Sequence, residues 1–226
     1  MRQSLERSLV VVFARAPRAG RAKTRLAPPL SYEEAARLQE AFVRDLVNRL
    51  GGAYAVELHT DEPTTAWADL ACPKRVQAAG DLGARLLCAL EDGLRRGYTS
   101  VAVLGSDSPT VPLDYVRELV GSEADVTLGP AEDGGFWGIA ARRTHPEMFR
   151  NVAWSTSKTC QQTVRAVSAA GLSVALGQAW FDVDEPASLE RLLRGPMGPA
   201  VQSAVATMGL CGFSCSVARE EWEKPA

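Results

Sequence analysis

The sequence of 226 residues lacks the features that mark several classes of protein. Its five cysteines are scattered, with no C-x-x-C pair and no histidine nearby, so a zinc site is not expected and reduced thiols are the default. The net charge is only −2, which supplies no overall attraction to nucleic acid. The first apolar run is six residues long, too short for a signal peptide or a membrane span. We therefore expect a cytoplasmic protein that binds neither nucleic acid nor a membrane.

Two glycine-rich signatures of nucleotide binding are also missing. A dinucleotide fingerprint needs G-x-G-x-x-G after the first strand, and Gly20 is the only glycine in that region. A P-loop needs G-x-x-x-x-G-K-[ST], but Lys23 and Thr24 lie two residues too far from Gly20, and the first glycine is absent. Neither of these binding modes is expected.

The central feature of the sequence is an apolar run that leads directly into a cluster of cations. Residues 9–14 are apolar, which predicts a strand buried on both faces in a mostly parallel sheet. Five positive charges follow within eleven residues: Arg15, Arg18, Arg21, Lys23 and Arg25. Because open α/β folds bind their ligands at the carboxyl edge of the sheet, this loop predicts an anionic ligand. The alternative is an ordinary solvated surface.

Strand and helix patterns alternate along the rest of the chain. Helices are predicted from Ser31 to Gly51, from Asp81 to Gly97, and over 112–120, 158–170 and 187–193; strands are predicted over 54–60, 74–78, 100–104, 125–129, 136–141 and 173–176. The alternation predicts a three-layer α/β/α sandwich with a mostly parallel sheet. We expect one domain over residues 1–194 and a C-terminal tail, residues 195–226, of unknown role and weakly helical at 201–208.

Helix caps give some polar residues a structural interpretation. Ser31 and Glu34 have the spacing of a capping box, and Ser157 or Thr156 is the expected cap of the helix at 158–170. Asp81 is a natural N-cap, an interpretation that competes evenly with contact to a nucleotide.

Acidic residues lie at three predicted strand exits. Asp107 follows the strand at 100–104, Glu132 and Asp133 follow the strand at 125–129, and Asp182 and Asp184 precede the helix at 187–193. Carboxylates beside a cationic loop suggest Mg²⁺ or Mn²⁺ bridging protein and phosphate oxygens. The opposing interpretation is that each aspartate is only a cap or turn former, and the glycines at 134 and 135 also suit a plain hairpin.

Six segments in order resemble a bacterial family of glycosyltransferase A-type, nucleotide-diphospho-sugar transferase-like proteins, often described as radical-SAM-associated or arsenosugar-biosynthesis transferases. The segments are residues 13–26 (FARAPRAGRAKTRL), 80–86 (GDLGARL), 105–109 (GSDSP), 132–136 (EDGGF), 154–156 (WST) and 182–186 (DVDEP). The chain is more distantly similar to guanylyltransferases of the molybdenum-cofactor and phospholactate type. The first loop departs from the sugar-nucleotide pyrophosphorylases in lacking their clustered glycines.

The resemblance implies roles for particular residues. Lys23 and Arg25 would bind phosphates, Asp107 would hold the metal, and Asp184 with Asp182 would complete its ligands. The wider set implied for nucleotide binding is Arg15, Gly20, Arg21, Lys23, Arg25 and Asp81, and the set implied for the acceptor is Gly134, Gly135, Trp154, Ser155 and Thr156.

Two reactions remain open. In a nucleotidylyltransferase, a phosphate- or phosphonate-bearing acceptor attacks the α-phosphorus of a nucleoside triphosphate, and Lys23, Arg25 and Mg²⁺ neutralise the transition state. In a glycosyltransferase that uses a nucleotide-diphospho-sugar, Asp133 or Glu132 must deprotonate the acceptor. Five cations suit a triphosphate and an anionic acceptor better, which favours the first reaction. A nucleotide-sensing or scaffold protein without catalysis is the third alternative.

Overall fold

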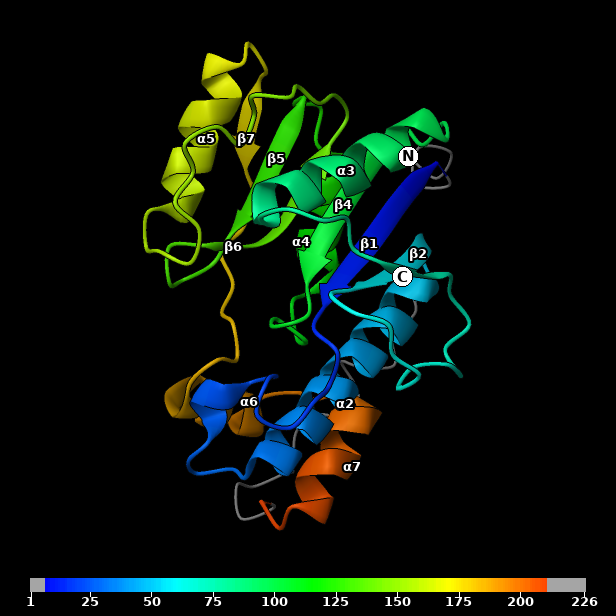
Figure 1. Ribbon diagram of the computed structural model, residues 1–226, viewed down its shortest axis with the longest axis vertical. Helices are drawn as coiled ribbons and strands as arrows, with labels where there is room; N and C mark the ends of the chain where they lie inside the picture. The colour runs from blue at the N-terminus through cyan, green and yellow to red at the C-terminus, as the bar shows by residue number, and fades with distance from the viewer. Residues whose placement is uncertain (1–6, 211–226) are drawn as a thin grey trace.

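The computed structural model describes residues 7–210, which form a seven-stranded sheet with helices on both faces (Figure 1). The strands are β1 (Ser8–Ala14), β2 (Ala55–Thr60), β3 (Lys74–Val76), β4 (Ser100–Gly105), β5 (Val126–Pro130), β6 (Phe136–Ala141) and β7 (Val174–Leu176). Their order is β3-β2-β1-β4-β6-β5-β7. Of these strands β6 runs antiparallel to both neighbours, and the other pairings are parallel. The predicted mostly parallel sheet is confirmed.

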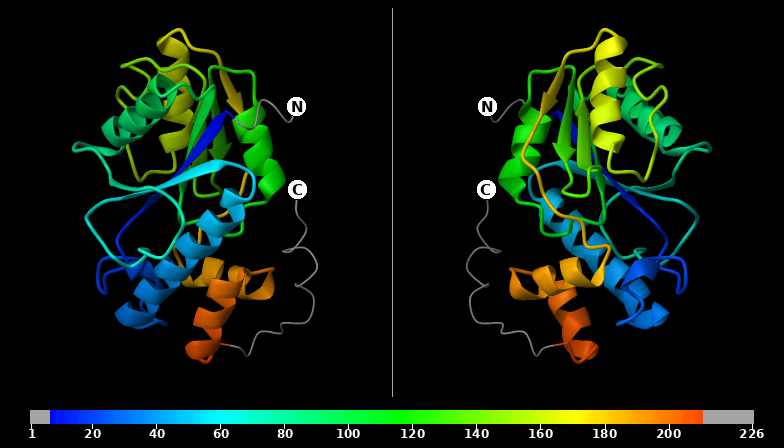
Figure 2. Two further views of the ribbon diagram at one scale, coloured as in Figure 1. Left: turned by 90° about the vertical axis from the view of Figure 1, so that its right-hand side faces the viewer. Right: turned by 90° about the vertical axis from the view of Figure 1, so that its left-hand side faces the viewer.

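The helices make the outer layers of the sandwich. They are α2 (Tyr32–Gly51), α3 (Leu82–Arg95), α4 (Leu113–Gly121), α5 (Thr159–Ala169), α6 (Pro186–Arg194) and α7 (Pro199–Thr207), with a short 3₁₀ helix, η1 (Thr24–Leu26). α3 and α5 pack on one face of the sheet, and α4 and the second half of α2 pack on the other (Figure 2). No helix within residues 7–210 is long and apolar enough to cross a membrane.

Local sequence accounts for most element boundaries. The capping box of α2 is present, since Ser31 Oγ accepts from Glu34 N at 3.2 Å and Glu34 Oε2 accepts from Ser31 N at 2.8 Å. Asp81 Oδ1 accepts from Ala84 N at 2.9 Å at the start of α3, so its capping role is confirmed. The predicted cap of α5 is wrong, because Lys158 occupies the N-cap position and makes no side-chain capping bond.

A second packed unit lies below the sheet in Figure 1. We call it the helical cluster; its buried apolar side chains come from η1, the first half of α2, the segment ahead of α6, and α6 and α7. Asp45 of α2 accepts from Ala200 N and Val201 N at the start of α7, both at 2.9 Å. Residues 199–207, predicted as part of a weakly helical tail, therefore pack into the same body as α2. The rest of that predicted tail from residue 211 onward lies outside the described residues.

Candidate active site

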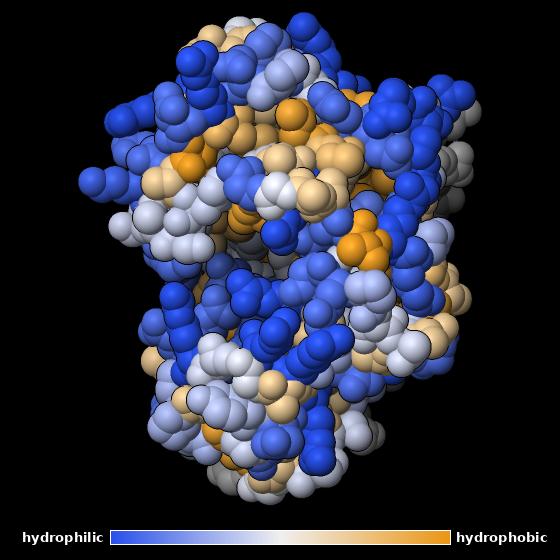
Figure 3. All heavy atoms as spheres, in the orientation of Figure 1, coloured by the Kyte–Doolittle hydropathy of each residue, from blue (hydrophilic) through white to orange (hydrophobic). Residues whose placement is uncertain are grey.

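Three segments that are distant in sequence meet at the carboxyl edge of the sheet. They are the loop after β1, residues 105–110 after β4, and the extended segment 177–185, which runs from β7 down to α6 (Figure 1). Val183 N donates to the Asp107 carbonyl at 2.8 Å, and Trp180 N donates to the Pro130 carbonyl at 3.0 Å. These bonds hold 177–185 along β5 and the loop after β4. Figure 3 shows a hollow bordered mostly by hydrophilic residues, at the level where the sheet meets the helical cluster.

Lys23 is the centre of this meeting point. Its Nζ lies 2.5 Å from Asp107 Oδ1 and 2.9 Å from Asp184 Oδ1, and it donates to the Val183 carbonyl at 2.9 Å. The Phe42 ring centroid is 5.4 Å from the same nitrogen. The Lys23 side chain is 3% exposed, whereas those of Asp107 and Asp184 are 45% and 40% exposed. The lysine therefore reaches the carboxylates from inside the protein, and the carboxylates face solvent.

The environment of Lys23 keeps its ammonium charged. Burial alone would lower the pKa of Lys23, but the charges of Asp107 and Asp184 and their hydrogen bonds outweigh it, so the pKa is raised. The backbone of Lys23 is left-handed, with φ 50° and ψ 37°, a conformation that costs a non-glycine residue about 1 kcal/mol or more. Such strain is common at functional sites.

Asp182 lies beside this group but differs from Asp184. Its carboxylate accepts a hydrogen bond from Ser108 Oγ. Burial raises the pKa of Asp182 to about 7, the Ser108 bond acts against that rise, and the charges of Asp107, Asp133 and Asp184 add to it. Asp182 is therefore largely neutral below pH 7 while no cation is bound, and among the described residues it forms no ion pair with Lys23, whereas Asp184 does.

The carboxylates can be tested for their fit to Mg²⁺. Within residues 7–210 no group of three or more His, Cys, Asp or Glu side chains is arranged to hold a metal ion. Asp107 and Asp184 instead share the Lys23 ammonium. Mg²⁺ in nucleotide enzymes is usually bound by one or two carboxylates plus substrate phosphates and water. The pair Asp107 and Asp184 is therefore a chemically sufficient protein contribution.

The loop between β5 and β6 is a hairpin connection packed against α5. Asp133 Oδ1 accepts from Gly135 N at 2.8 Å, and the Gly134 carbonyl accepts from Cys160 N at 2.9 Å. A Cβ on Gly134, whose φ is +90°, would lie 2.1 Å from the carbonyl oxygen of Ser157. The glycine is thus required by the approach of another backbone segment, as the hairpin interpretation allowed. Glu132 is bound to Arg191 of α6 at 2.7 Å.

The predicted acceptor residues 154–156 lie in a corner with the start of α3. Trp154 packs on Phe136 and Phe149, with ring centroids 6.4 Å and 5.8 Å away, and a Cβ on Gly83 would come within 2.9 Å of the indole. The neighbours Ser155 and Thr156 are exposed. Asp81 therefore shares a corner with residues 154–156. In the described part of the chain no hydrogen bond or ion pair joins this corner to Lys23.

The five cationic side chains of the first loop differ in the contacts that they make. Arg18 and Arg21 lie 2.6 Å and 3.9 Å from Glu62, at the exit of β2, and Lys23 is bound as described. Arg15 and Arg25 are exposed and form no ion pair or side-chain hydrogen bond with any described residue. These two arginines can therefore bind an anion without first breaking a contact. A Cβ on Gly20, whose φ is +74°, would meet no atom within 4 Å.

Several contacts at the site were absent from the sequence prediction. Phe42 lies within the helix predicted from Ser31 to Gly51 but had no predicted role at the site, and the Val183 carbonyl carries no side-chain signal. Ser108 belongs to a predicted motif but had no role, and Glu62 could have been found as a charged residue at a strand exit.

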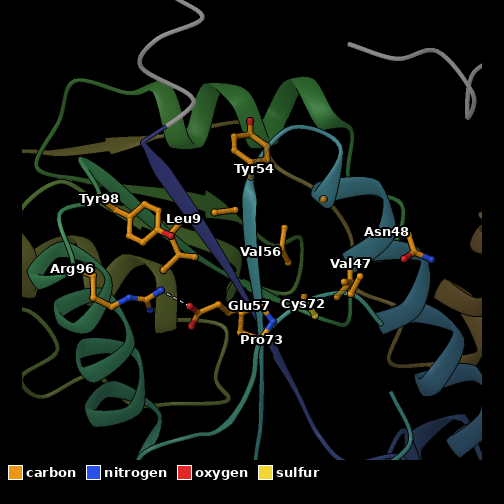
Figure 4. Close-up of a pocket in the computed structure, with 13 residues that line it drawn as sticks. Leu9, Val47, Asn48, Tyr54, Val56, Glu57, Cys72, Pro73, Arg96 and Tyr98 are labelled. Carbon is orange, nitrogen blue, oxygen red and sulfur yellow. Dashed lines mark hydrogen bonds and ion pairs between the residues drawn. The ribbon is translucent and has the colours of Figure 1, made fainter. Parts of the chain in front are cut away.

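A separate cavity of about 450 Å³ opens at the opposite edge of the sheet, near the start of β1 and β2 (Figure 4). Leu9 and Val56 are among its apolar lining residues. Its charged groups are already paired, since Glu57 lies 2.5 Å from Arg96 and 3.3 Å from Arg75. This cavity is distinct from the meeting point of the three segments.

Comparison with known proteins decides the family. Residues 42–156 match the family described as "Uncharacterized protein conserved in bacteria (DUF2064)". The chain belongs to the DUF2064 family. It is 31% identical over 179 residues to the 2-phospho-L-lactate guanylyltransferase of Haloarcula marismortui, covering 79% of this chain and 83% of that protein. It is also 31% identical over 193 residues to the 3-phospho-D-glycerate guanylyltransferase of Phenylobacterium zucineum, covering 78% and 86%.

A solved structure agrees with this relationship. A protein of Desulfovibrio desulfuricans G20 described as a nucleotide-diphospho-sugar transferase superposes with a TM-score of 0.82 at 25% identity, covering 91% of this chain and 96% of that one. The predicted fold and the predicted similarity to phospholactate guanylyltransferases are therefore confirmed. These relatives are all named as transferases, and the chain is a transferase as well.

Proposed function

We propose that the chain is a nucleotidylyltransferase that joins a nucleoside triphosphate to a small phosphorylated carboxylic acid and releases pyrophosphate. The observation that carries the proposal is the Lys23 ammonium shared by Asp107 and Asp184 at the carboxyl edge of the sheet. The two relatives at 31% identity support it, because both are named as guanylyltransferases of phosphorylated hydroxy acids. GTP is accordingly the first nucleotide to test, and a cytoplasmic setting suits a user of nucleoside triphosphates.

The proposed reaction is a displacement at phosphorus. An oxygen of the acceptor phosphate attacks the α-phosphorus, a new P–O–P linkage forms, and the bond to the pyrophosphate leaving group breaks. The attacking oxygen is already ionised, so no general base is required. Lys23 and Arg25 hold and neutralise the phosphate oxygens, a role that contributes most in the transition state.

A divalent cation completes the charge balance in this proposal. Asp107 and Asp184 would hold Mg²⁺ or Mn²⁺, with Asp182 as a weaker neighbour. When bound, the ion supplies positive charge to the triphosphate oxygens as the leaving group departs. The exposure of both carboxylates to solvent gives the ion access to them.

The second candidate is glycosyl transfer from a nucleotide-diphospho-sugar, favoured by the description of the Desulfovibrio structure. This reaction needs a base for the acceptor hydroxyl. Glu132 is bound to Arg191, which leaves Asp133 as the better candidate. Asp133 is exposed, and one of its oxygens already accepts from Gly135 N.

The two reactions release different products, so one experiment separates them. The protein is incubated with Mg²⁺, each of the four nucleoside triphosphates, and 2-phospho-L-lactate or 3-phospho-D-glycerate, and pyrophosphate is measured. In parallel it is incubated with Mg²⁺, nucleotide-diphospho-sugars and the same acceptors, and nucleoside diphosphate is measured. We expect acceptor-dependent pyrophosphate release that is lost in Asp107→Asn and retained in Arg95→Ala, a matched control at an exposed cation of α3. Release of nucleoside diphosphate from a nucleotide sugar, with no pyrophosphate from any triphosphate, would overturn the proposal.

A further inference from the structure

The position of the Lys23 ammonium points to a role that phosphate binding does not explain. We infer that Lys23 is the resident counter-ion of Asp107 and Asp184, which holds the two carboxylates together until a divalent cation replaces it. The inference rests on the proposed function, because it concerns the same site. It makes Lys23 a positioning residue for the metal ligands before it becomes a phosphate ligand.

The geometry places the ammonium where a shared cation would have to bind. Both Asp107 Oδ1 and Asp184 Oδ1 contact one nitrogen, at 2.5 Å and 2.9 Å, so the two oxygens face one point in space. A divalent cation bound by these same two oxygens would lie at or beside that point. Because an ammonium and a divalent cation repel each other strongly at such short range, binding of the metal there favours departure of the ammonium.

The surrounding charges explain why a resident cation is needed. Oδ1 of Asp107 and Oδ1 of Asp184 contact the same nitrogen, so the two carboxylates lie close together. Without Lys23 the negative charges of Asp107 and Asp184 would repel each other, and this solvent-facing pair would lose the contact that holds it together. Lys23 therefore keeps Asp107 and Asp184 in place while no metal is bound.

The same contacts provide a route for exchange. The lysine stem is buried and its ring neighbour is Phe42, so the ammonium approaches from the protein side. The carboxylates are nearly half exposed, so a metal approaches from solvent. The displaced ammonium needs a new anionic partner, which the nucleotide phosphates would supply. Metal and nucleotide should therefore bind cooperatively, and metal alone should bind weakly.

The counter-ion role predicts that loss of the Lys23 charge strengthens the binding of metal alone, whereas a lysine that only bound phosphate would not have this effect. Removal of the ammonium should strengthen the binding of metal alone, even though turnover falls. Lys23→Met keeps an apolar stem against Phe42 and removes the charge. Arg25→Met is the matched control, because Arg25 also lies in the first loop but contacts neither carboxylate among the described residues.

The test is the affinity for Mn²⁺ without nucleotide, measured by the electron paramagnetic resonance signal of free Mn²⁺. We expect the dissociation constant to fall about 10-fold or more in Lys23→Met and to stay within about twofold of wild type in Arg25→Met. Adding Asp107→Asn to Lys23→Met should abolish the gain. Lys23→Gln, which keeps a polar tip for the carboxylates, replaces Lys23→Met if thermal unfolding shows that the latter is not folded.

The outcomes separate this inference from the proposed function. Equal or weaker Mn²⁺ binding in the Lys23 variants overturns the counter-ion role, whatever the enzyme transfers. Tighter binding supports it even if no triphosphate is turned over, in which case the reaction assignment alone fails.

Discussion

Replacement of Gly134 by alanine gives the sharpest test of how the loop between β5 and β6 is built. A Cβ at this position would lie 2.1 Å from the Ser157 carbonyl oxygen and 2.6 Å from two further backbone atoms of that residue. The left-handed backbone, φ +90°, adds about 1–2 kcal/mol of strain for alanine. Backbone displacement adds about 1–3 kcal/mol, as in overpacked cores. We expect Gly134→Ala to lower the free energy of unfolding by about 3 kcal/mol.

Substitutions at two other glycines serve as controls in the same assay. Gly20→Ala introduces a residue at φ +74° with nothing within 4 Å, so it should cost only the strain, about 1 kcal/mol. Gly135→Ala would meet only the Asp133 side chain, nearest at 3.1 Å, and should cost less than about 1 kcal/mol. Urea denaturation ranks the three variants, and thermal unfolding should show Gly134→Ala about 6–12 °C below wild type. Equal stability of Gly134→Ala and Gly20→Ala would refute the argument from close approach.

Further predictions concern the site and the helical cluster. Arg25→Ala should lower kcat/KM by about 10- to 100-fold, and Arg25→Lys should restore only part of it, because a point charge cannot replace a bidentate fork; steady-state kinetics with the nucleotide that releases pyrophosphate checks this. Asp184→Asn should reduce turnover more than Asp182→Asn, since Asp184 contacts Lys23 and Asp182 is largely neutral below pH 7; the reverse ranking would contradict the assignment. Asp45→Ala leaves two backbone N–H groups of α7 without their acceptor and should cost about 2–4 kcal/mol in urea denaturation. Burial raises the pKa of Asp45 above its ordinary 3.8, so the folded protein holds this proton more tightly than the unfolded chain does. As pH rises from about 3.8 through the raised pKa, the free energy of unfolding of wild type should therefore fall relative to that of Asp45→Asn. A rise over that pH range would contradict the raised pKa.

Most helices and strands were predicted from the sequence because apolar patterns and capping residues lie within or next to the element that they define. The apolar run of residues 9–14 becomes β1, and the box formed by Ser31 and Glu34 opens α2. The order and direction of the strands were harder to predict, because nothing in residues 136–141 indicates that β6 runs antiparallel between β4 and β5. An apolar stripe also does not identify its partner. The predicted three-layer sandwich places its helices on the sheet, but the first half of α2 packs in the helical cluster.

The part of the site that lies directly after parallel strands was predictable from the sequence. Residues that follow β1 and β4 meet because parallel strands end at one edge, which brings Lys23 to Asp107. Asp184 reaches the same point through the extended segment 177–185, whose path depends on backbone bonds to β5 and to the Asp107 carbonyl. Such bonds leave no trace in side-chain patterns. The pairing of Glu132 with Arg191 was not predicted because it joins the side chains of two elements that are distant in sequence.

The two ion pairs of Lys23 belong to different parts of the molecule. Lys23 and Asp184 are both anchored in the helical cluster, through η1 and the start of α6, whereas Asp107 is anchored in the sheet at the end of β4. A rigid shift of the helical cluster against the sheet would break the hydrogen bond from Val183 N to the Asp107 carbonyl, and it would change the distance from Lys23 to Asp107 while leaving that to Asp184 unchanged. In a nucleotide-bound structure, a change in the distance from Lys23 to Asp107 alone would therefore indicate movement of the helical cluster against the sheet. Equal changes in the distances from Lys23 to Asp107 and to Asp184 would indicate movement of the lysine side chain alone.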